Sequence, residues 1–245
     1  MKTKFLMLSG LAILLTLFTN INAQDAATIV KKIDEVLYAP KDQKNMVKIV
    51  NVEKNGTEKI QKAYVIQKGY DKRLFKFIEP ASQKGIAFLS LPNDVMYLYM
   101  PAFGKERRIA SHIKNQSFAG MVFSYEDLES KLLSEKYNAK LLNSDNECYT
   151  LELTPKPNQN SEYSKLIMKV NKNEYYPLNA EYYDKTGKKI KISEYNFEKR
   201  GKYWSPIVLK MTDLRSNKST SMILEKVEYD TGLTDDDFSV RKLLQ

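Results

Sequence analysis

The chain contains 245 residues and carries a formal net charge of +9, with 39 Lys and Arg against 30 Asp and Glu. The single cysteine, Cys148, excludes an internal disulfide, and the single histidine, His112, excludes metal sites built from several histidines. The sequence has no Gly-rich phosphate loop and no G-x-S-x-G motif, so nucleotide sites and a serine nucleophile elbow have no support.

The first 23 residues are typical of a secretory signal peptide. Lys2 and Lys4 precede an apolar stretch that ends near Phe18, and at roughly fourteen residues it is shorter than the ~20 that span a membrane. Ala23 follows a stretch of small and polar residues, so we expect cleavage after it. Residues 24–245 contain no repeat or Pro/Gly-rich linker, and we expect them to form a single exported domain.

A helix is predicted first, and strands dominate the rest of the chain. In "DAATIVKKIDEVLYAP" the apolar residues recur at helical spacing, and Pro40 marks the end of the pattern. Ten later segments alternate apolar and polar residues between short turn signals, which indicates a mainly β (α+β) fold, an antiparallel meander of about 10–11 strands. These segments are "KAYVIQKG", "RLFKFIEP", "GIAFLSL", "VMYLYMP", "CYTLELTP", "YSKLIMKV", "YPLNAEYYD", "KIKISEYNF", "YWSPIVLKM" and "SMILEKVEYD".

The two faces of these strands differ in polarity. In "LIMKV" and "IVLKM" one face is apolar and the other carries lysine, as in strands with one face in water. In "GIAFLSL" and "VMYLYMP" both faces are apolar, so both must be covered. We therefore expect some strands to lie under helices or to face an internal cavity.

Residues 111–144 lack this alternation. They contain "YEDLESKLLSEKY", in which Leu128, Leu132 and Leu133 recur at helical spacing. We expect this segment to form helices that cover the open mouth or the concave side of the sheet.

The acidic residues of "SFAGMVFSYEDLES" could be catalytic acids, metal ligands or the polar start of a helix. Ser124 and Asp127 have the spacing of a capping box, and Glu126 lies in the same first turn, where negative charge suits the helix dipole. Thr234 and Asp237 repeat that spacing near the C-terminus. We interpret both groups as helix caps, because no partner for catalysis is apparent and the alternating ligands of a calcium loop are absent.

The run "GKERRIAS" brings Lys105, Arg107 and Arg108 together after an aromatic strand. These side chains could hold a phosphate headgroup or a partner's carboxylates, or they could form a solvated hairpin.

The sequence resembles the outer membrane lipoprotein-sorting family, the LolA-like group of the LolA/LolB/RseB superfamily. The most specific part is "GIAFLSLPNDVMYLYMPAFGKERRIASHIKNQSFAGMVFSYEDL", supported by "YYPLNAEYYDKTGKKIK", "GKYWSPIVLKMTD" and "LTDDDFSVRKLL". The resemblance implies a strongly curved antiparallel sheet, an unclosed barrel whose concave side is covered by helices. It also implies a periplasmic protein that holds acyl chains, carries out no chemistry, and works beside a membrane transporter.

This reading predicts a cavity for the acyl chains of lipids or lipoproteins, with no catalytic residue, metal or cofactor. Its partners would be an inner-membrane transporter or an outer-membrane acceptor, and not nucleic acid. The predicted cavity wall comprises Phe88, Met96, Leu98, Tyr99, Leu209 and Met211. Phe118, Met121 and Phe123 are the predicted lid, and Lys105, Arg107 and Arg108 are the predicted docking or headgroup residues.

Two alternatives stay open. An RseB-like sensor or adaptor would use the same fold to bind a membrane protein's periplasmic segment. An envelope hydrolase would require catalysis by the carboxylates or by His112.

Overall fold

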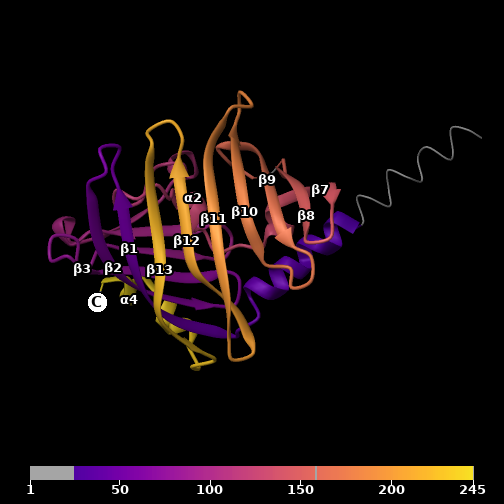
Figure 1. Ribbon diagram of the computed structural model, residues 1–245. Coiled ribbons are helices and arrows are strands. Elements are labelled where there is room, and N and C mark those ends of the chain that lie inside the picture. The colour runs from indigo at the N-terminus through magenta and orange to yellow at the C-terminus, as the bar shows by residue number, and fades with distance from the viewer. Residues whose placement is uncertain (1–24, 158, 245) are drawn as a thin grey trace, which may run out of the picture.

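The computed structural model describes residues 25–157 and 159–244, so the predicted signal peptide over residues 1–23 lies outside the described residues. The described chain forms one antiparallel sheet of thirteen strands that is not closed into a barrel (Figure 1). The predicted fold class is confirmed. The strands are β1 (Asp42–Val52), β2 (Glu58–Lys68), β3 (Lys72–Glu79), β4 (Ala87–Leu91), β5 (Val95–Tyr99), β6 (Glu106–Arg108), β7 (Tyr137–Ser144), β8 (Cys148–Pro155), β9 (Tyr163–Asn171), β10 (Pro177–Asp184), β11 (Lys189–Arg200), β12 (Tyr203–Asp213) and β13 (Lys218–Tyr229).

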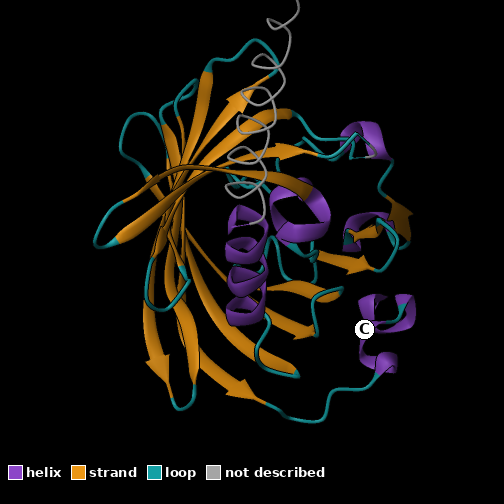
Figure 2. Ribbon diagram, turned by 90° about the vertical axis from the view of Figure 1, so that its right-hand side faces the viewer, coloured by secondary structure: helices purple, strands orange, loops and turns teal. Residues whose placement is uncertain are grey.

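The helices are short apart from the first. Residues 25–37 are helical, and the other helical turns are η1 (Pro101–Phe103), η2 (Ser111–Ile113), α2 (Tyr125–Leu128), α3 (Leu133–Lys136), η3 (Asp235–Phe238) and α4 (Val240–Leu244). In Figure 2 the curved sheet wraps around the helix of residues 25–37.

The order of the strands explains how the concave side is filled. The chain starts in the middle with β1, adds hairpins outward to β6 at one edge, and then crosses to β7 at the other edge. From β7 it returns by hairpins until β13 pairs with β1. The crossing connection, residues 109–136, is called the plug below; it carries η2, α2 and α3.

All ten predicted strands are present, and three further strands were missed. β1 places Gln43, Asn45 and Asn51 on its inner face, which weakens its apolar alternation. β6 has only three residues, too few to show a period of two. β7 follows α3 directly and continues the leucine pattern that indicated a helix.

The predicted helix through Leu128, Leu132 and Leu133 is broken into α2 and α3. Glu129 has φ −57° and ψ 134°, which ends the first turn. Ser130 then bonds to β4 and to the turn between β2 and β3: its N–H donates to Ser90 Oγ at 3.3 Å, and its hydroxyl donates to the Tyr70 carbonyl at 2.9 Å. These long-range bonds hold the chain extended between the two turns.

Apolar side chains pack on both faces of part of the sheet. The main core fills the concave side, and a second cluster lies on the convex side. There Leu233, Phe238 and Leu243 of the C-terminal segment cover β2 to β5. The first four residues of β4 are buried, as its two apolar faces predicted.

Candidate ligand-binding site

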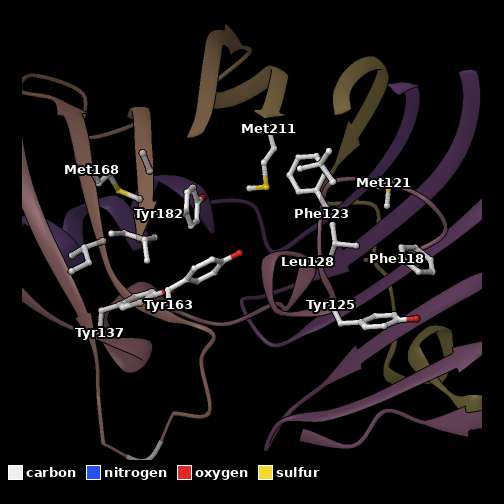
Figure 3. Packing of buried hydrophobic residues seen from close by; sticks show 14 of the residues in the cluster. Phe118, Met121, Phe123, Tyr125, Leu128, Tyr137, Tyr163, Met168, Tyr182 and Met211 are labelled. Atoms are coloured by element: carbon white, nitrogen blue, oxygen red, sulfur yellow. The ribbon is translucent and has the colours of Figure 1, made fainter. Parts of the chain in front are cut away.

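The plug is anchored to the concave face by aromatic packing. The Phe118 ring lies 5.5 to 5.7 Å from the rings of Phe77, Phe75, Phe88 and Tyr125. Figure 3 shows Phe118, Met121 and Phe123 gathered on one side of α2. Because Phe118 and Met121 are at most 2% exposed, this part of the plug belongs to the packed core.

Buried polar side chains add a second anchor. Thr220 on β13 accepts a hydrogen bond from the Val122 N–H at 2.9 Å and donates to Asn51 Oδ1 at 2.6 Å. Asn51 in turn donates to Gln61 Oε1 at 2.7 Å. Each of these buried polar groups has a partner, so the network fixes the plug without leaving desolvated donors.

Both predicted capping boxes are present. The Ser124 hydroxyl accepts from the Asp127 N–H at 3.2 Å, and Asp127 Oδ2 accepts from the Ser124 N–H at 2.9 Å. At η3, Asp237 Oδ2 accepts from the Thr234 N–H at 2.8 Å and from the Thr234 hydroxyl at 2.9 Å. Capping alone does not explain the acidic residues of the plug, however, because they also pair with distant lysines.

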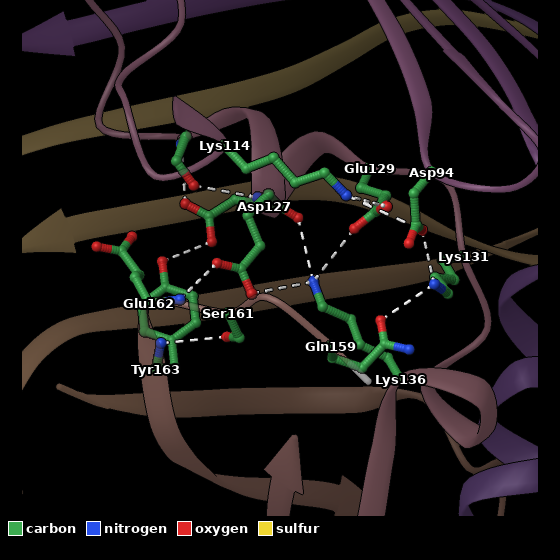
Figure 4. A network of polar contacts seen from close by, with 12 residues as sticks. Asp94, Lys114, Asp127, Glu129, Lys131, Lys136, Gln159, Ser161, Glu162 and Tyr163 are labelled. Carbon is green, nitrogen blue, oxygen red and sulfur yellow. Dashed lines mark hydrogen bonds and ion pairs between the residues drawn. The ribbon is translucent and has the colours of Figure 1, made fainter. Parts of the chain in front are cut away.

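These long-range contacts form a buried network of charges (Figure 4). Asp127 Oδ2 lies 2.9 Å from Lys191 Nζ of β11, and each side chain is 3% exposed. Asp127 Oδ1 accepts a hydrogen bond from the Tyr163 hydroxyl of β9 at 2.7 Å. The other ion pairs of the plug carboxylates are Glu126–Lys136 at 3.4 Å, Glu129–Lys114 at 3.2 Å and Glu129–Lys136 at 3.7 Å.

The protonation of this network follows from burial and pairing. Burial alone would raise the pKa of Asp127, but Lys191, the Ser124 N–H and the Tyr163 hydroxyl together lower it. Burial would lower the pKa of Lys191, and its carboxylate neighbours Asp127 and Glu162 raise it. Burial raises the pKa of Glu162. Asp127 and Lys191 therefore form a charged pair at neutral pH.

Two adjacent lobes of a cavity lie between the concave face, the helix of residues 25–37 and the plug. Their volumes are about 260 Å³ and 190 Å³. They share lining residues from both halves of the sheet and from the plug, so they are neighbours. The shared residues are Gln43, Gln67, Arg73, Asp127, Ser205, Pro206 and Leu209.

The lobes have different walls. The first has a charged floor made by Glu126, Asp127, Glu129, Lys131 and Lys136, facing Leu166, Met168 and the aromatic rings of Tyr182, Tyr195 and Phe197. The second is mostly apolar and is lined by Val47, Val65, Phe75, Phe123, Leu128, Leu209, Met222 and Leu224. Leu209, Met222 and Leu224 are only half-buried, so the lobe exposes apolar surface that the fold itself does not cover.

The residues predicted from the sequence to line a cavity are spread over several environments. Leu209 borders both lobes, and Phe123, from the predicted lid, borders the second. Phe88, Met96 and Met211 are at most 2% exposed and lie in the main core. Leu98 is half-buried and packs against that core.

Tyr99 lies on the other face of the sheet. It packs against the convex cluster with Leu233 and Phe238 of the C-terminal segment. Its strand neighbours Met96 and Leu98 take the concave side, and alternation turns Tyr99 away from it.

The predicted docking residues are at the surface. Lys105, Arg107 and Arg108 are exposed on the hairpin that joins β5 and β6. Phe103 on the same hairpin is 52% exposed, and the Arg107 guanidinium carbon lies 4.5 Å from the centre of its ring. The hairpin therefore presents a cluster of cations around an exposed aromatic ring.

Several residues of the site were missed at the level of sequence. Arg73 borders both lobes, and Lys191 and Lys136 neutralise the plug carboxylates. Lysines in alternating strands normally indicate a face in water, so the lysines of "KIKISEYNF" gave no sign that one of them is buried. The one feature of the sequence that could have indicated buried lysines is the concentration of acidic residues in the plug, because buried carboxylates need cationic partners.

Other kinds of site have little support in the described part of the chain. No group of three His, Cys, Asp or Glu side chains within it is placed to hold a metal ion. None of the helices within residues 25–157 and 159–244 is long and apolar enough to cross a membrane.

Comparisons with known proteins place this architecture among solved structures. A family model described as an uncharacterized protein matches residues 69–245, and no curated protein matches the chain. A domain described as an outer membrane lipoprotein-sorting protein, from Vibrio parahaemolyticus, is 28% identical with a TM-score of 0.82, covering 91% of this chain and 100% of that one.

Two further structures share the architecture. A DUF1329 family protein from Desulfovibrio piger is 26% identical with a TM-score of 0.84, covering 91% of this chain and 99% of its own. A LolA superfamily protein from Nitrosomonas europaea is 24% identical with a TM-score of 0.74, covering 89% and 97%. The last similarity is one of fold.

Proposed function

We propose that this chain is a LolA-like protein that carries acyl chains in the periplasm; its likeness to an outer membrane lipoprotein-sorting domain, at 28% identity over 91% of this chain, supports the proposal. Residues 1–23 are a cleaved signal peptide in this proposal, and residues 24–245 are one lipid- or lipoprotein-binding domain. The carrier works beside an inner-membrane transporter or an outer-membrane acceptor. It performs no catalysis and needs no cofactor.

The observation that carries the proposal is apolar surface inside the molecule. Leu209, Met222 and Leu224 lie under the plug but are only half-buried, because they face a cavity. Side chains in a fully packed core leave few voids larger than a water molecule. Each methylene of a bound chain that covers this surface contributes roughly 0.8 kcal/mol before ordering costs.

The size of the cavity bears on how a chain enters. An apolar cavity of about 150 Å³ accepts a ligand such as benzene, so lobes of about 260 Å³ and 190 Å³ accept a short or folded single chain. A lipid with two long chains requires the plug to move away from the sheet. Phe123 and Leu128 of the plug, which border the second lobe, are the lid residues in this proposal.

The test compares two adjacent positions on β12. Leu209 borders both lobes, whereas Val208 belongs to the opposite face because neighbouring strand residues alternate. We predict that Leu209→Gln lowers the affinity for a fluorescent fatty acid about tenfold, and that Val208→Gln leaves it within twofold. The expected loss reflects burial of an amide without a partner, which costs about 1–3 kcal/mol.

Titration of delipidated protein with the fluorescent fatty acid measures both variants. Equal affinities for Leu209→Gln, Val208→Gln and the unaltered chain would contradict the location of the binding site. If the unaltered protein takes up no fatty acid, the carrier function is contradicted and the sensor or adaptor function is favoured.

A further inference from the structure

Arg73 is a cation on the wall that the two lobes share. It lies on β3 opposite Gln67 of β2 and is half-buried. Its Nε and Nη2 donate to Gln67 Oε1 at 3.1 and 2.6 Å, and its Nη1 donates to the Leu128 carbonyl oxygen at 3.0 Å. A guanidinium has five N–H groups, so two remain after these three bonds to described residues.

Arg73 has no counter-charge among the described residues. Within residues 25–157 and 159–244, no carboxylate oxygen lies within 4.0 Å of a guanidinium nitrogen of Arg73. Its three hydrogen bonds go to neutral acceptors, an amide and a backbone carbonyl. Burial lowers the pKa of Arg73 and Tyr38 raises it, but a guanidinium stays protonated at any pH in which the protein functions.

The charges nearby differ in this respect, because each is matched. The matched pairs around the first lobe are Asp127–Lys191 at 2.9 Å, Glu129–Lys114 at 3.2 Å, Glu126–Lys136 at 3.4 Å and Asp94–Lys131 at 2.7 Å. Among the described residues that line the two lobes, Arg73 is therefore the cation without a carboxylate partner. Partial burial of a charge without a partner has a cost in free energy, and an anion from a ligand would reduce that cost.

We infer that Arg73 binds the anionic group of a single-chain amphiphile, a carboxylate or a phosphate monoester, whose chain fills the second lobe. This inference rests on the proposed carrier function and names the class of its ligand. A guanidinium pairs with both groups through two parallel N–H bonds, which suits the two N–H groups that remain. Apart from Arg73 and Asp127, which is already paired with Lys191, the second lobe is lined by uncharged side chains.

Ligands that have the same alkyl chain but different head groups should therefore differ in affinity. An acyl chain attached to a neutral head, as in a fatty alcohol, gains only the apolar contacts. A fatty acid anion or an alkyl phosphate gains these and a charge-assisted pair with Arg73. Because hydrogen bonds to charged groups are the stronger class, we expect a preference of about tenfold or more for the anions.

Displacement of the neutral dye N-phenyl-1-naphthylamine from delipidated full-length mature protein tests this. The competitors are decanoate, decyl phosphate and decanol at a pH where both anions are ionised, with millimolar inorganic phosphate as a chainless anion. We expect the two decyl anions to displace the dye at about tenfold lower concentration than decanol. Inorganic phosphate alone should leave the dye bound, and displacement by it would assign the site to a free anion.

The variants Arg73→Met, Arg73→Lys and Arg215→Met assign the preference to one residue. Arg73→Met should bind all three decyl ligands alike, with its decanol affinity within threefold of the unaltered chain. Arg73→Lys should retain part of the preference because it retains the charge, and it serves alone if Arg73→Met does not fold. Arg215→Met, which removes a surface cation paired with Asp213 at 2.7 Å, should retain all of it.

Two results overturn different claims. Equal displacement by decanol and decanoate in the unaltered chain refutes the role of Arg73 and leaves the carrier intact. Failure of every decyl ligand to displace the dye or bind by calorimetry refutes the carrier as well.

Discussion

Asp127 combines a local contact with a long-range one in a single side chain. It closes the capping box with Ser124 at the start of α2, and it pairs with Lys191, which lies 64 residues later in the chain. The first contact sets the direction of a short turn. The second ties the plug to β11 and so to the far half of the sheet.

We predict that Asp127→Asn lowers the free energy of unfolding by about 3 kcal/mol, since breaking a buried ion pair leaves a buried charge without its partner. Asn keeps an oxygen that can accept the Ser124 N–H bond, so the loss reports the pair with Lys191 together with the bond from the Tyr163 hydroxyl. Urea denaturation measures it.

Glu198→Gln provides the control because Glu198 pairs with Arg200 at 2.8 Å while both side chains are about half exposed, at 51% and 52%. This change should cost less than about 1 kcal/mol. A loss for Asp127→Asn as small as that of the control would show that the buried pair contributes little.

The effect of Asp127→Asn should also depend on pH. The folded state lowers the pKa of Asp127, so its charge stabilises the fold fully above the unfolded pKa of about 3.9. That stabilisation decreases as the pH falls through the folded pKa. The difference between the two proteins in urea should therefore shrink below about pH 4.

Single residues of the site could be predicted from the sequence only where their contacts are local. A capping box is a spacing of three residues, so Ser124 and Asp127 could be identified without a structure. Lys191, Tyr163 and Arg73 come from three different strands, and only the curvature and order of the sheet bring them to the plug. A cation in an alternating strand looks the same whether its face meets water or a buried carboxylate.

At the scale of elements, the C-terminal segment is the outer cover of β2 to β5. Leu243 is fully buried in the convex cluster, whereas the next residue, Leu244, is 41% exposed. Asp235 fastens the same segment by ion pairs with Lys68 and Lys72, both at 2.8 Å. These two ion pairs lower the pKa of Asp235 to about 2.

Two adjacent leucines make a matched test of this cover. We predict that Leu243→Ala lowers the free energy of unfolding by about 2–5 kcal/mol through the cavity it leaves. Leu244→Ala should change it by no more than about 0.5 kcal/mol. Thermal or urea unfolding measures both, and similar values for the two variants would mean that α4 does not cover the sheet in solution.

The β5–β6 hairpin has a testable role as a contact with an anionic membrane or partner. We predict that replacing Arg107 and Arg108 by Glu weakens binding to anionic vesicles in a manner that depends on salt, since exposed charges are screened. Lys199→Glu with Arg200→Glu makes the same change in net charge on the exposed end of β11. Co-sedimentation in which both double variants bind equally would show that only net charge matters.

Element types were predicted better than element boundaries. Both faces of "GIAFLSL" and "VMYLYMP" are apolar, which predicted that both are covered. The plug covers one face and the C-terminal segment covers the other. The leucines of "YEDLESKLLSEKY" indicated one helix, but contacts from Ser130 to Ser90 and Tyr70 divide it. Those contacts join residues far apart in sequence, so no local pattern could reveal them.

In the whole molecule, the strand order creates the concave space that contains the cavity. The first and last strands of the chain, β1 and β13, pair in the middle of the sheet, and the free edges of the sheet are β6 and β7. The single connection between those edges runs across the concave side as the plug. An open sheet with a plug can widen without unpairing any strand, which suits a carrier that must load and release its cargo.

In the proposed function, the mature protein carries acyl chains inside the cavity under the plug. Native mass spectrometry of protein purified from its own envelope, followed by solvent extraction, tests it most directly. We expect bound phospholipid, fatty acid or acylated peptide, on a chain whose intact mass lacks residues 1–23. Repeated recovery of lipid-free protein that also fails to take up a fluorescent fatty acid would contradict it.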